Sequence, residues 1–198
     1  MVSVIKVGST NQWRIGIIGS AGGSVFAEGF GLSSSVRSRV GLVASDRHCG
    51  LTDFAVTKKI PFSIINGRSN VERSDQFLSV LVAHNCNLVI SFYTRMFEGQ
   101  IVDFFKGRFL NFHPSILPAH PGMHGFEDAL RSDDDYLGAT VHMVDSTMDG
   151  GPIIMQSSFL NNRALSINRR QDMVFKLQVS QFVSLCESCD DIFGDNKN

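Results

Sequence analysis

The segment WRIGIIGSAGGSV, residues 13–25, contains the pattern on which the fold prediction depends. Residues 13–19 form a short apolar run that ends in glycine, residues 20–24 are a loop of small residues, and a helical pattern begins at Val25. A strand, a short loop and a helix in this order are typical of an α/β unit. We expect the same unit to recur if the protein has a parallel sheet.

The alternation does recur through the first half of the chain. Further strands are expected at residues 40–45, 61–65, 87–91 and 108–112, with helices at residues 51–59 and 71–84 between them. Strands that alternate with helices in this way favour a parallel sheet covered by helices on both faces.

The pattern changes after Asn111. A loop with Pro114, Pro118 and Pro121 precedes an expected short helix at residues 125–131. Two more strands are expected at residues 138–144 and 152–159, and a closing helix from residue 170 to about residue 189. Residues 1–12 are expected to be an N-terminal extension and residues 190–198 a frayed tail.

The composition predicts one globular domain that spans residues 1–198. The chain has 198 residues, of which 43% are hydrophobic and 19% charged, enough for one substantial core. The net charge is −1 and the basic residues are scattered, so we expect no nucleic-acid partner.

Membrane and export signals are not expected. No apolar run approaches the ~18 residues of a membrane span, and residues 1–12 lack the apolar core of a signal peptide. We therefore expect a cytoplasmic protein without a membrane partner. The four cysteines are irregularly spaced, and the pair Cys186 and Cys189 is expected to be structural rather than a metal or redox site.

Two segments carry side chains suited to chemistry: Asn111-Phe112-His113-Pro114 and Asp149-Gly150-Gly151-Pro152. Asn111 follows an expected strand, where α/β sheets place ligands, and its amide can bind an oxygen that becomes negative. His113, two residues on, projects to the same side and can transfer a proton. From the residues alone, a turn asparagine, a surface histidine and an Asp-Gly turn remain the alternatives.

The surrounding sequence resembles the central block of the folate-dependent formyltransferases, and within them the group that formylates glycinamide ribonucleotide in purine biosynthesis. The resemblance lies in NFHPSILPAHPGMHGFEDAL (residues 111–130) and GATVHMVDSTMDGGPII (residues 138–154). His113 and Asp149 are 36 residues apart (149 − 113), and His142 precedes Asp149 by seven, as in the family. The similarity is strong over residues 109–156 and looser elsewhere.

The resemblance implies a doubly wound, mostly parallel sheet with helices on both faces. It implies that Asn111, His113 and Asp149 are catalytic, and that His142 either supports Asp149 or is a satisfied core histidine. It also makes the bond between Leu117 and Pro118 a candidate for the cis form. No metal is required for this chemistry, because an amide, an imidazole and a carboxylate suffice.

The resemblance further implies three sets of binding residues. The phosphate of the substrate would bind at Gly22, Gly23 and Ser24. His124 and Gln181 would make other substrate contacts. The folate would lie in a cleft formed by Arg95, Met96, Phe97, Val144, Asp145 and Met148.

The sequence departs from the family pattern at three places. Val25 follows Gly23 and Ser24 where the family usually has asparagine, Phe92 stands where it often has glycine, and Gln181 stands where the purine enzyme has glutamate. These departures leave the identity of the formyl acceptor open.

The expected activity is transfer of a formyl group from 10-formyltetrahydrofolate to a primary amine. The expected amine is glycinamide ribonucleotide, which is phosphorylated. The alternatives are an acceptor such as a nucleotide-linked amino sugar, or a catalytically silent homologue that binds folate or a nucleotide. The tRNA-specific formyltransferases and the formyltetrahydrofolate hydrolases carry additional domains that are not expected here. The protein is expected to be a monomer or a homodimer.

Overall fold

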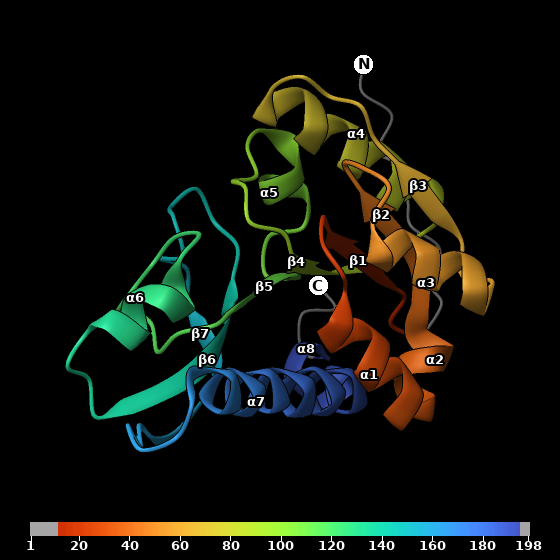
Figure 1. Cartoon of the computed structure of the whole chain (residues 1–198). Helices are drawn as coiled ribbons and strands as arrows, with labels where there is room; N and C mark the ends of the chain where they lie inside the picture. Colours follow the sequence, from red (N-terminus) through yellow and green to blue (C-terminus); the bar gives the residue numbers. More distant parts are fainter. Residues whose placement is uncertain (1–11, 195–198) are drawn as a thin grey trace.

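A seven-stranded sheet runs through the molecule in the order β3-β2-β1-β4-β5-β6-β7 (Figure 1). The structure, a computed structural model, describes residues 12–194. The strands β1 to β5 pair in parallel, whereas β6 and β7 pair antiparallel at one end of the sheet. The strands are β1 (Ile15–Gly19), β2 (Val40–Ser45), β3 (Phe62–Ile64), β4 (Leu88–Phe92), β5 (Phe109–His113), β6 (Tyr136–Met143) and β7 (Ile153–Leu160).

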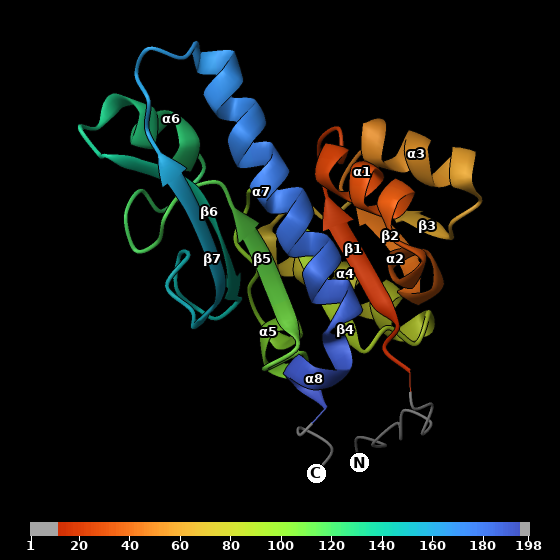
Figure 2. The ribbon, with the colours of Figure 1, turned by 90° about the horizontal axis from the view of Figure 1, so that it is seen from below.

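Helices cover both faces of this sheet, as Figure 2 shows for the face on which α7 lies. One core cluster joins the sheet to α1 (Ser24–Leu32), α2 (Ser34–Arg39), α3 (Gly50–Lys58), α7 (Ile167–Glu187) and α8 (Cys189–Phe193). The second cluster joins the opposite face to α4 (Asn70–Ala83) and α5 (Gln100–Phe104). The remaining helix, α6 (Gly125–Arg131), packs against β6 and α7 in a third cluster. The α/β, doubly wound and mostly parallel fold is therefore confirmed.

The central strand β1 explains why the strands read as apolar runs. Ile15 and Ile17 belong to the cluster on one face, whereas Ile18 belongs to the cluster on the other. Because successive side chains of a strand point to opposite faces, a sheet covered on both sides needs apolar residues at every position. The chain leaves β1 for β2 and β3, then returns to β4 on the other side of β1. Ligands of such sheets bind at this change of direction.

Serine side chains begin the two longest helices. Ser69 accepts a hydrogen bond from the backbone N–H of Glu72 at 3.0 Å, and Ser166 accepts one from Arg169 at 3.2 Å. These bonds satisfy N–H groups that have no partner within the helix. The helices begin at Asn70 and Ile167, one and three residues before the starts expected from periodicity at residues 71 and 170.

Three short helices, α2, α5 and α8, were not expected from the sequence. The prediction of a frayed tail from residue 190 is wrong as far as Gly194, because α8 continues to Phe193. The ring of Phe193 is 1% exposed and packs edge-on against Trp13 at 5.6 Å. Burial of this ring anchors the end of the described chain. Residues 1–11 and 195–198 lie outside the described residues, so most of the expected N-terminal extension does too.

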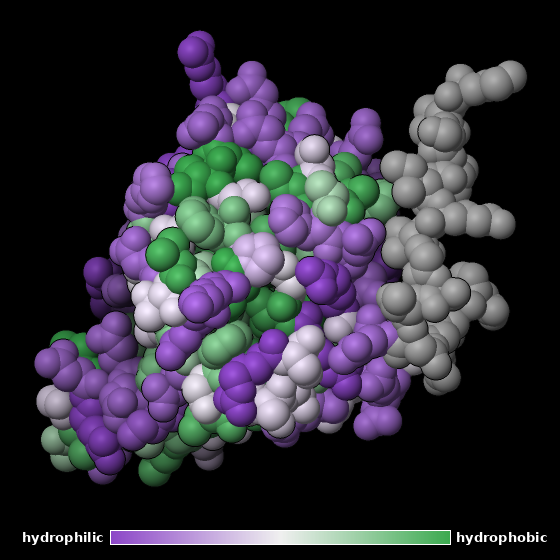
Figure 3. All heavy atoms as spheres, turned by 90° about the vertical axis from the view of Figure 1, so that its right-hand side faces the viewer, coloured by the Kyte–Doolittle hydropathy of each residue, from purple (hydrophilic) through white to green (hydrophobic). Residues whose placement is uncertain are grey.

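The surface mixes hydrophilic and hydrophobic side chains, as the face at the β3 end of the sheet shows (Figure 3). Val56 of α3 and Phe62 of β3 are among the exposed apolar residues. Among residues 12–194, no helix has the length and the apolar content needed to cross a membrane.

All four cysteines are free thiols, and three of them are buried. Burial raises the pKa of Cys86 to about 12 and that of Cys189 to about 11, and it also raises the pKa of Cys186. A thiol that stays protonated is a poor nucleophile and a poor metal ligand. These values support the interpretation of Cys186 and Cys189 as structural residues.

Candidate active site

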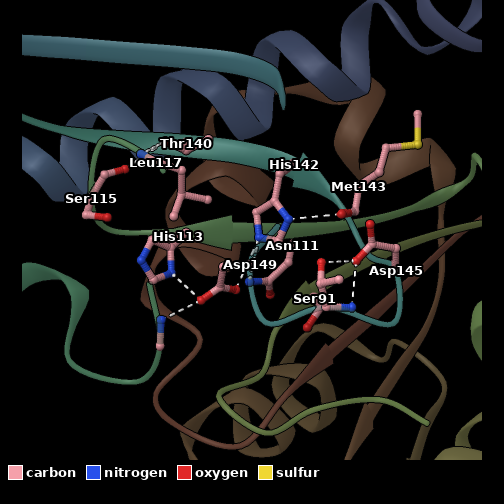
Figure 4. A network of polar contacts seen from close by, with 12 residues as sticks. Ser91, Asn111, His113, Ser115, Leu117, Thr140, His142, Met143, Asp145 and Asp149 are labelled. Carbon is pink, nitrogen blue, oxygen red and sulfur yellow. Dashed lines mark hydrogen bonds and ion pairs between the residues drawn. The ribbon is translucent and has the colours of Figure 1, made fainter. Parts of the chain in front are cut away.

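Three polar side chains meet at the junction of β5 and β6 (Figure 4). Asn111 and His113 are two residues apart on β5, so they project to the same side of the sheet. His142 lies directly opposite Asn111 in the antiparallel pair of β5 and β6. As a result, Nδ2 of Asn111 lies 3.4 Å from Nε2 of His142.

Asp149 completes the cluster from the loop between β6 and β7. Its Oδ2 lies 3.4 Å from Nδ1 of His113, and its Oδ1 lies 3.4 Å from Nε2 of His142. The backbone N–H of Gly122 donates a hydrogen bond to Oδ2 at 2.7 Å. The carboxylate is therefore held between two imidazole rings and a backbone donor.

The segment around Asp149 combines an unusual backbone conformation with close packing. Asp149 itself has a φ of 51°, whereas neither Gly150 nor Gly151 has a positive φ. The glycines instead allow the chain to approach itself closely. A Cβ on Gly151 would lie 2.0 Å from the carbonyl oxygen of Met143, and a Cβ on Gly150 would lie 2.4 Å from Oγ1 of Thr147.

Backbone carbonyls fix which ring nitrogens face Asp149. Nε2 of His113 lies 2.8 Å from the carbonyl oxygen of His120, so this nitrogen carries a proton and donates it. Nδ1 of His142 donates in the same way to the carbonyl oxygen of Met143 at 2.9 Å. Nδ1 of His113 and Nε2 of His142 are therefore the nitrogens free to exchange a proton with Asp149 or with a ligand.

The environment shifts the pKa values of two of these groups. Burial lowers the pKa of His113, although the carbonyl of His120 and the charge of Asp149 act in the opposite direction. Burial alone would raise the pKa of Asp149, but hydrogen bonds from His142 and Gly122 and the charge of His113 outweigh it and lower that pKa. Asp149 is therefore ionised at neutral pH, beside an imidazole that favours its neutral form.

A pocket opens on this cluster. One wall comes from the segment after β4 and the other from the loop after β6, and the floor comes from the end of β5. All six residues expected at the folate cleft line it. The lining consists of Phe92, Tyr93, Thr94, Arg95, Met96, Phe97, Asn111, Phe112, His113, Pro114, Gly122, Met123, His142, Val144, Asp145, Thr147, Met148 and Asp149.

One polar atom of the pocket lacks a partner. Oδ1 of Asn111 is buried and makes no hydrogen bond within the described protein. A buried polar atom without a partner is costly, so its presence in a pocket is typical of a ligand site. The amide can present either end to a ligand, because turning it by 180° exchanges the oxygen and the nitrogen.

The wall after β4 is held by contacts to neighbouring strands. The hydroxyl of Tyr93 donates a hydrogen bond to Oδ2 of Asp46 at 2.8 Å, and the guanidinium of Arg95 lies 3.9 Å from the same oxygen. Burial and the bond to Asp46 raise the pKa of Tyr93 to about 12. The ring of Phe92 packs on Phe112 at 5.0 Å and on Phe182 at 5.8 Å. Phe92 thus belongs both to the pocket lining and to an aromatic cluster that reaches α7.

The expected phosphate loop, Gly22 to Ser24, lies outside the pocket lining but at the same edge of the sheet. It follows β1, and Gly19 at the end of β1 pairs with Phe92 at the end of β4. The N-terminus of α1 has no capping side chain and no acidic residue in its first turn. Gly23 has a φ of 64° and packs so closely on Leu51 that a Cβ would lie 2.7 Å from it.

Two residues expected to contact the substrate, Gln181 and His124, lie outside the lining of this pocket. Gln181 is buried between α7 and the sheet, where its Nε2 donates to the carbonyl of Ala139 at 3.0 Å and to Oγ of Ser157 at 3.2 Å. The face of α7 that reaches the aromatic cluster presents Phe182 instead, because one residue turns a helix by about 100°. His124 is exposed at the start of α6 and does not line the pocket.

A hydrogen-bond network that the sequence did not reveal holds the loop after β5. The backbone N–H of Leu117 donates to Oγ1 of Thr140 at 3.1 Å, and Nε2 of Gln156 donates to the carbonyl of Leu117 at 2.8 Å. Thr140 in turn donates to the carbonyl of Ser115 at 2.7 Å. The bond between Leu117 and Pro118 is cis, as predicted. No motif marks these residues, because their partners are distant in the sequence.

Comparison with known proteins gives a consistent result. The family model described as formyl transferase matches residues 14–178. A phosphoribosylglycinamide formyltransferase of Mycobacterium tuberculosis is 37% identical over 123 residues, which are 60% of this chain and 57% of that protein. The enzyme of the same name from Escherichia coli is 40% identical over 70 residues, 35% of this chain and 33% of that protein. The matched segments thus span less than two thirds of these relatives.

Solved structures share the fold over most of the chain. The phosphoribosylglycinamide formyltransferase of Bacillus halodurans has a TM-score of 0.82 at 24% identity, covering 89% of this chain and 95% of that chain. Glycinamide ribonucleotide transformylase 1 of Symbiobacterium toebii has a TM-score of 0.81 at 25% identity, covering 90% and 87%.

Proposed function

The chain belongs to the formyl transferase family, and from this membership we propose that it transfers a formyl group from 10-formyltetrahydrofolate to the primary amine of glycinamide ribonucleotide. The observation that carries the proposal is the convergence of Asn111, His113 and Asp149 on one pocket. The two relatives named above that are phosphoribosylglycinamide formyltransferases support the choice of acceptor.

The donor supplies the formyl group, and the pocket is suited to a ligand of its kind. Apolar side chains of Met96, Phe97, Val144 and Met148 offer surfaces to a flat ring system, and the half-exposed guanidinium of Arg95 offers a positive charge to a carboxylate. The unpartnered amide oxygen of Asn111 marks the end of the pocket where polar contacts are missing. These features support the assignment of the folate to this pocket.

The three polar residues have complementary tasks in the proposed reaction. The amine nitrogen forms a bond to the formyl carbon, and the bond from that carbon to the donor nitrogen breaks. Asn111 would hold the formyl oxygen while it carries negative charge. Nδ1 of His113 would take the proton that the amine loses and return a proton to the donor nitrogen, and ionised Asp149 would stabilise the charged ring between these transfers.

The loop after β1 is the proposed site for the phosphate of the acceptor. Backbone N–H groups at the start of α1 have no side-chain cap, and a helix N-terminus favours an anion. In the sheet order, β4 separates β1 from β5. Neighbouring strands are about 4.8 Å apart, so the loop and Asn111 are separated by roughly 10 Å across the sheet. A phosphorylated amine with a sugar between its two ends has a suitable length.

A transfer assay tests the proposal. Purified protein with 10-formyltetrahydrofolate and glycinamide ribonucleotide should release tetrahydrofolate in proportion to formylated amine. Release with an amino-sugar nucleotide but not with glycinamide ribonucleotide would identify the amino sugar as the acceptor. Release without any amine would indicate a hydrolase. Tight donor binding with no release in any mixture would contradict the proposed transferase activity.

A further inference from the structure

His120 holds its backbone in an unusual conformation beside the pocket. It lies in the loop between β5 and α6 and has a φ of 56°, the left-handed region that favours glycine. Residues other than glycine adopt this conformation at an energetic cost, so surrounding contacts must maintain it.

The conformation directs the carbonyl of His120 at the candidate active site. This oxygen accepts a hydrogen bond from Nε2 of His113 at 2.8 Å and another from Oγ of Ser115 at 3.1 Å. The first bond decides the tautomer of His113, because it keeps the proton on Nε2 and leaves Nδ1 facing Asp149. The backbone geometry of His120 therefore sets which nitrogen of His113 is available for proton transfer.

A side-chain contact of the same residue fixes this geometry. Nε2 of the His120 ring lies 2.6 Å from Oδ2 of Asp134, which follows α6. The carbonyl of Asp134 accepts a hydrogen bond from Nδ2 of Asn161 at 3.0 Å, and Oδ1 of Asn161 accepts one from Arg170 of α7 at 2.9 Å. A continuous set of contacts thus connects the loop beside His113 to the body of the protein.

We propose that the pair His120 and Asp134 is a positioning device that holds the proton of His113 on Nε2. The carboxylate of the pair is exposed, so the pair contributes little to the stability of the fold and acts on the local geometry of the loop. Loss of the pair therefore relaxes the loop without unfolding the protein. The titratable groups that face His113 are Asp149, His142 and His120, and the one that faces the His120 ring is Asp134.

The variant Asp134→Ala tests the proposal, with Asp133→Ala as its matched control. Asp133 is the preceding residue and is fully exposed, and its carboxylate lies 3.7 Å from Arg163 rather than near His120. Both variants remove one negative charge from the same loop. Only Asp134→Ala is expected to lower kcat, by about tenfold, as for other groups that orient a reacting side chain. The KM for the donor should not change.

The kinetic measurement rests on the proposed function. A second measurement is therefore needed that does not depend on it. Long-range 15N NMR of protein labelled at its six histidines reports the tautomer of His113 without any substrate. Wild type and Asp133→Ala should show the proton on Nε2, whereas Asp134→Ala should show a mixture of both tautomers. If wild type transfers no formyl group, the proposed function fails and the NMR result alone decides the inference.

A double variant separates positioning from a general loss of stability. Glycine adopts a φ of 56° without strain, so His120→Gly in the Asp134→Ala protein should recover part of the Nε2 tautomer and of kcat. Recovery supports positioning by the backbone. An Asp134→Ala protein whose tautomer and kcat match those of Asp133→Ala would overturn the proposal.

Discussion

Asp149 contacts a different histidine with each of its two carboxylate oxygens. His113 and His142 each use one ring nitrogen to bind a backbone carbonyl, and each turns the other toward Asp149. A proton that reaches any of the three groups can therefore be shared with its neighbours over contacts of 3.4 Å. At the scale of single residues, this arrangement makes His113 the main test of the proposed chemistry.

The variant His113→Ala should lose at least roughly 10² in kcat if the imidazole transfers the proton or stabilises the developing charge. His84→Ala is a matched control, because that histidine lies at the end of α4 and does not line the pocket. Initial rates of tetrahydrofolate release measure both. A near-normal rate for His113→Ala would remove this residue from the chemistry.

Folding stability should depend on pH through His113. Because burial lowers the pKa of His113 in the folded protein, the unfolded chain binds more protons as pH falls below the ordinary value of 6.5. The contribution of His113 therefore lowers the free energy of unfolding as the pH falls from about 7.5 to about 5.5. The pKa of Asp149 is lowered, so its stabilising effect is lost only below pH ~4 and stays constant in this window.

Urea unfolding at both pH values measures this effect. The wild-type midpoint should fall on acidification, and the midpoint of His113→Gln should fall less. An equal fall in both proteins would show that other groups account for the dependence.

At the scale of elements, α6 begins directly against the active-site ring. A Cβ on Gly125, its first residue, would lie 2.4 Å from Nε2 of His113. Alanine is otherwise the better helix former by about 1 kcal/mol, so helix propensity and packing act in opposite directions here. The contact identifies a position where a small change in a helix should reach the chemistry.

Gly125→Ala should therefore lower kcat by roughly tenfold or more, because a displacement of about 1 Å at a reacting group is costly. Gly31→Ala in α1 is the control, since a Cβ at Gly31 meets no other residue within 4 Å. It should leave kcat unchanged and stabilise the protein by about 0.5–1 kcal/mol. Steady-state rates and thermal unfolding distinguish the two variants, and equal rates would exclude the expected displacement of His113.

The loop before α1 offers a second matched pair. Gly23→Ala combines a positive φ with a clash against Leu51, whereas a Cβ on Gly31, farther along α1, meets no atom within 4 Å. If this loop binds the phosphate of the acceptor, Gly23→Ala should raise the KM for the acceptor about tenfold and leave the affinity for the donor unchanged. Gly31→Ala should change neither by more than about twofold. A rise in the KM for the donor with Gly23→Ala would contradict a role of the loop in binding only the acceptor.

The sequence predicted most of the sheet because strands buried on both faces leave a strong apolar signal. It also drew attention to Asn111, His113 and Asp149, since their residue types stand beside prolines and glycines. The direction of the Gln181 side chain could not be predicted, because each residue turns a helix by about 100° and a match of letters does not fix the facing side. The role of His120 depends on Asp134 and could not be read from either residue alone.

At the scale of the molecule, both core layers share one continuous sheet. The C-terminal helices α7 and α8 pack on the same face as α1 and α2, so the two ends of the described chain belong to one cluster. Trp13, the only tryptophan, packs against Phe193 of α8. Its fluorescence therefore reports contact between the start and the end of the chain.

We predict a single cooperative unfolding transition, as expected for one domain. Trp13 fluorescence and far-UV circular dichroism should give coincident urea midpoints, because loss of the terminal contact and loss of the sheet would occur together. Phe182→Ala, which removes a fully buried ring in contact with Phe26, Phe92 and Phe112, should lower the free energy of unfolding by about 3–5 kcal/mol. Two separated transitions in wild type would contradict the single-domain prediction.

The ladder between β6 and β7 closes the base of the loop that carries Asp149. The N–H of Met143 donates to the carbonyl of Pro152 at 2.8 Å, and His142 pairs with Ile153. Residues 144–151 therefore form an excursion from the sheet. Its two ends are held together by residues outside it, at the ends of β6 and β7. Evolution can alter the other residues of this excursion while Asp149 and the reactive groups of β5 stay in place. The residues that select the ligand can in this way change while the residues that carry out the reaction are kept.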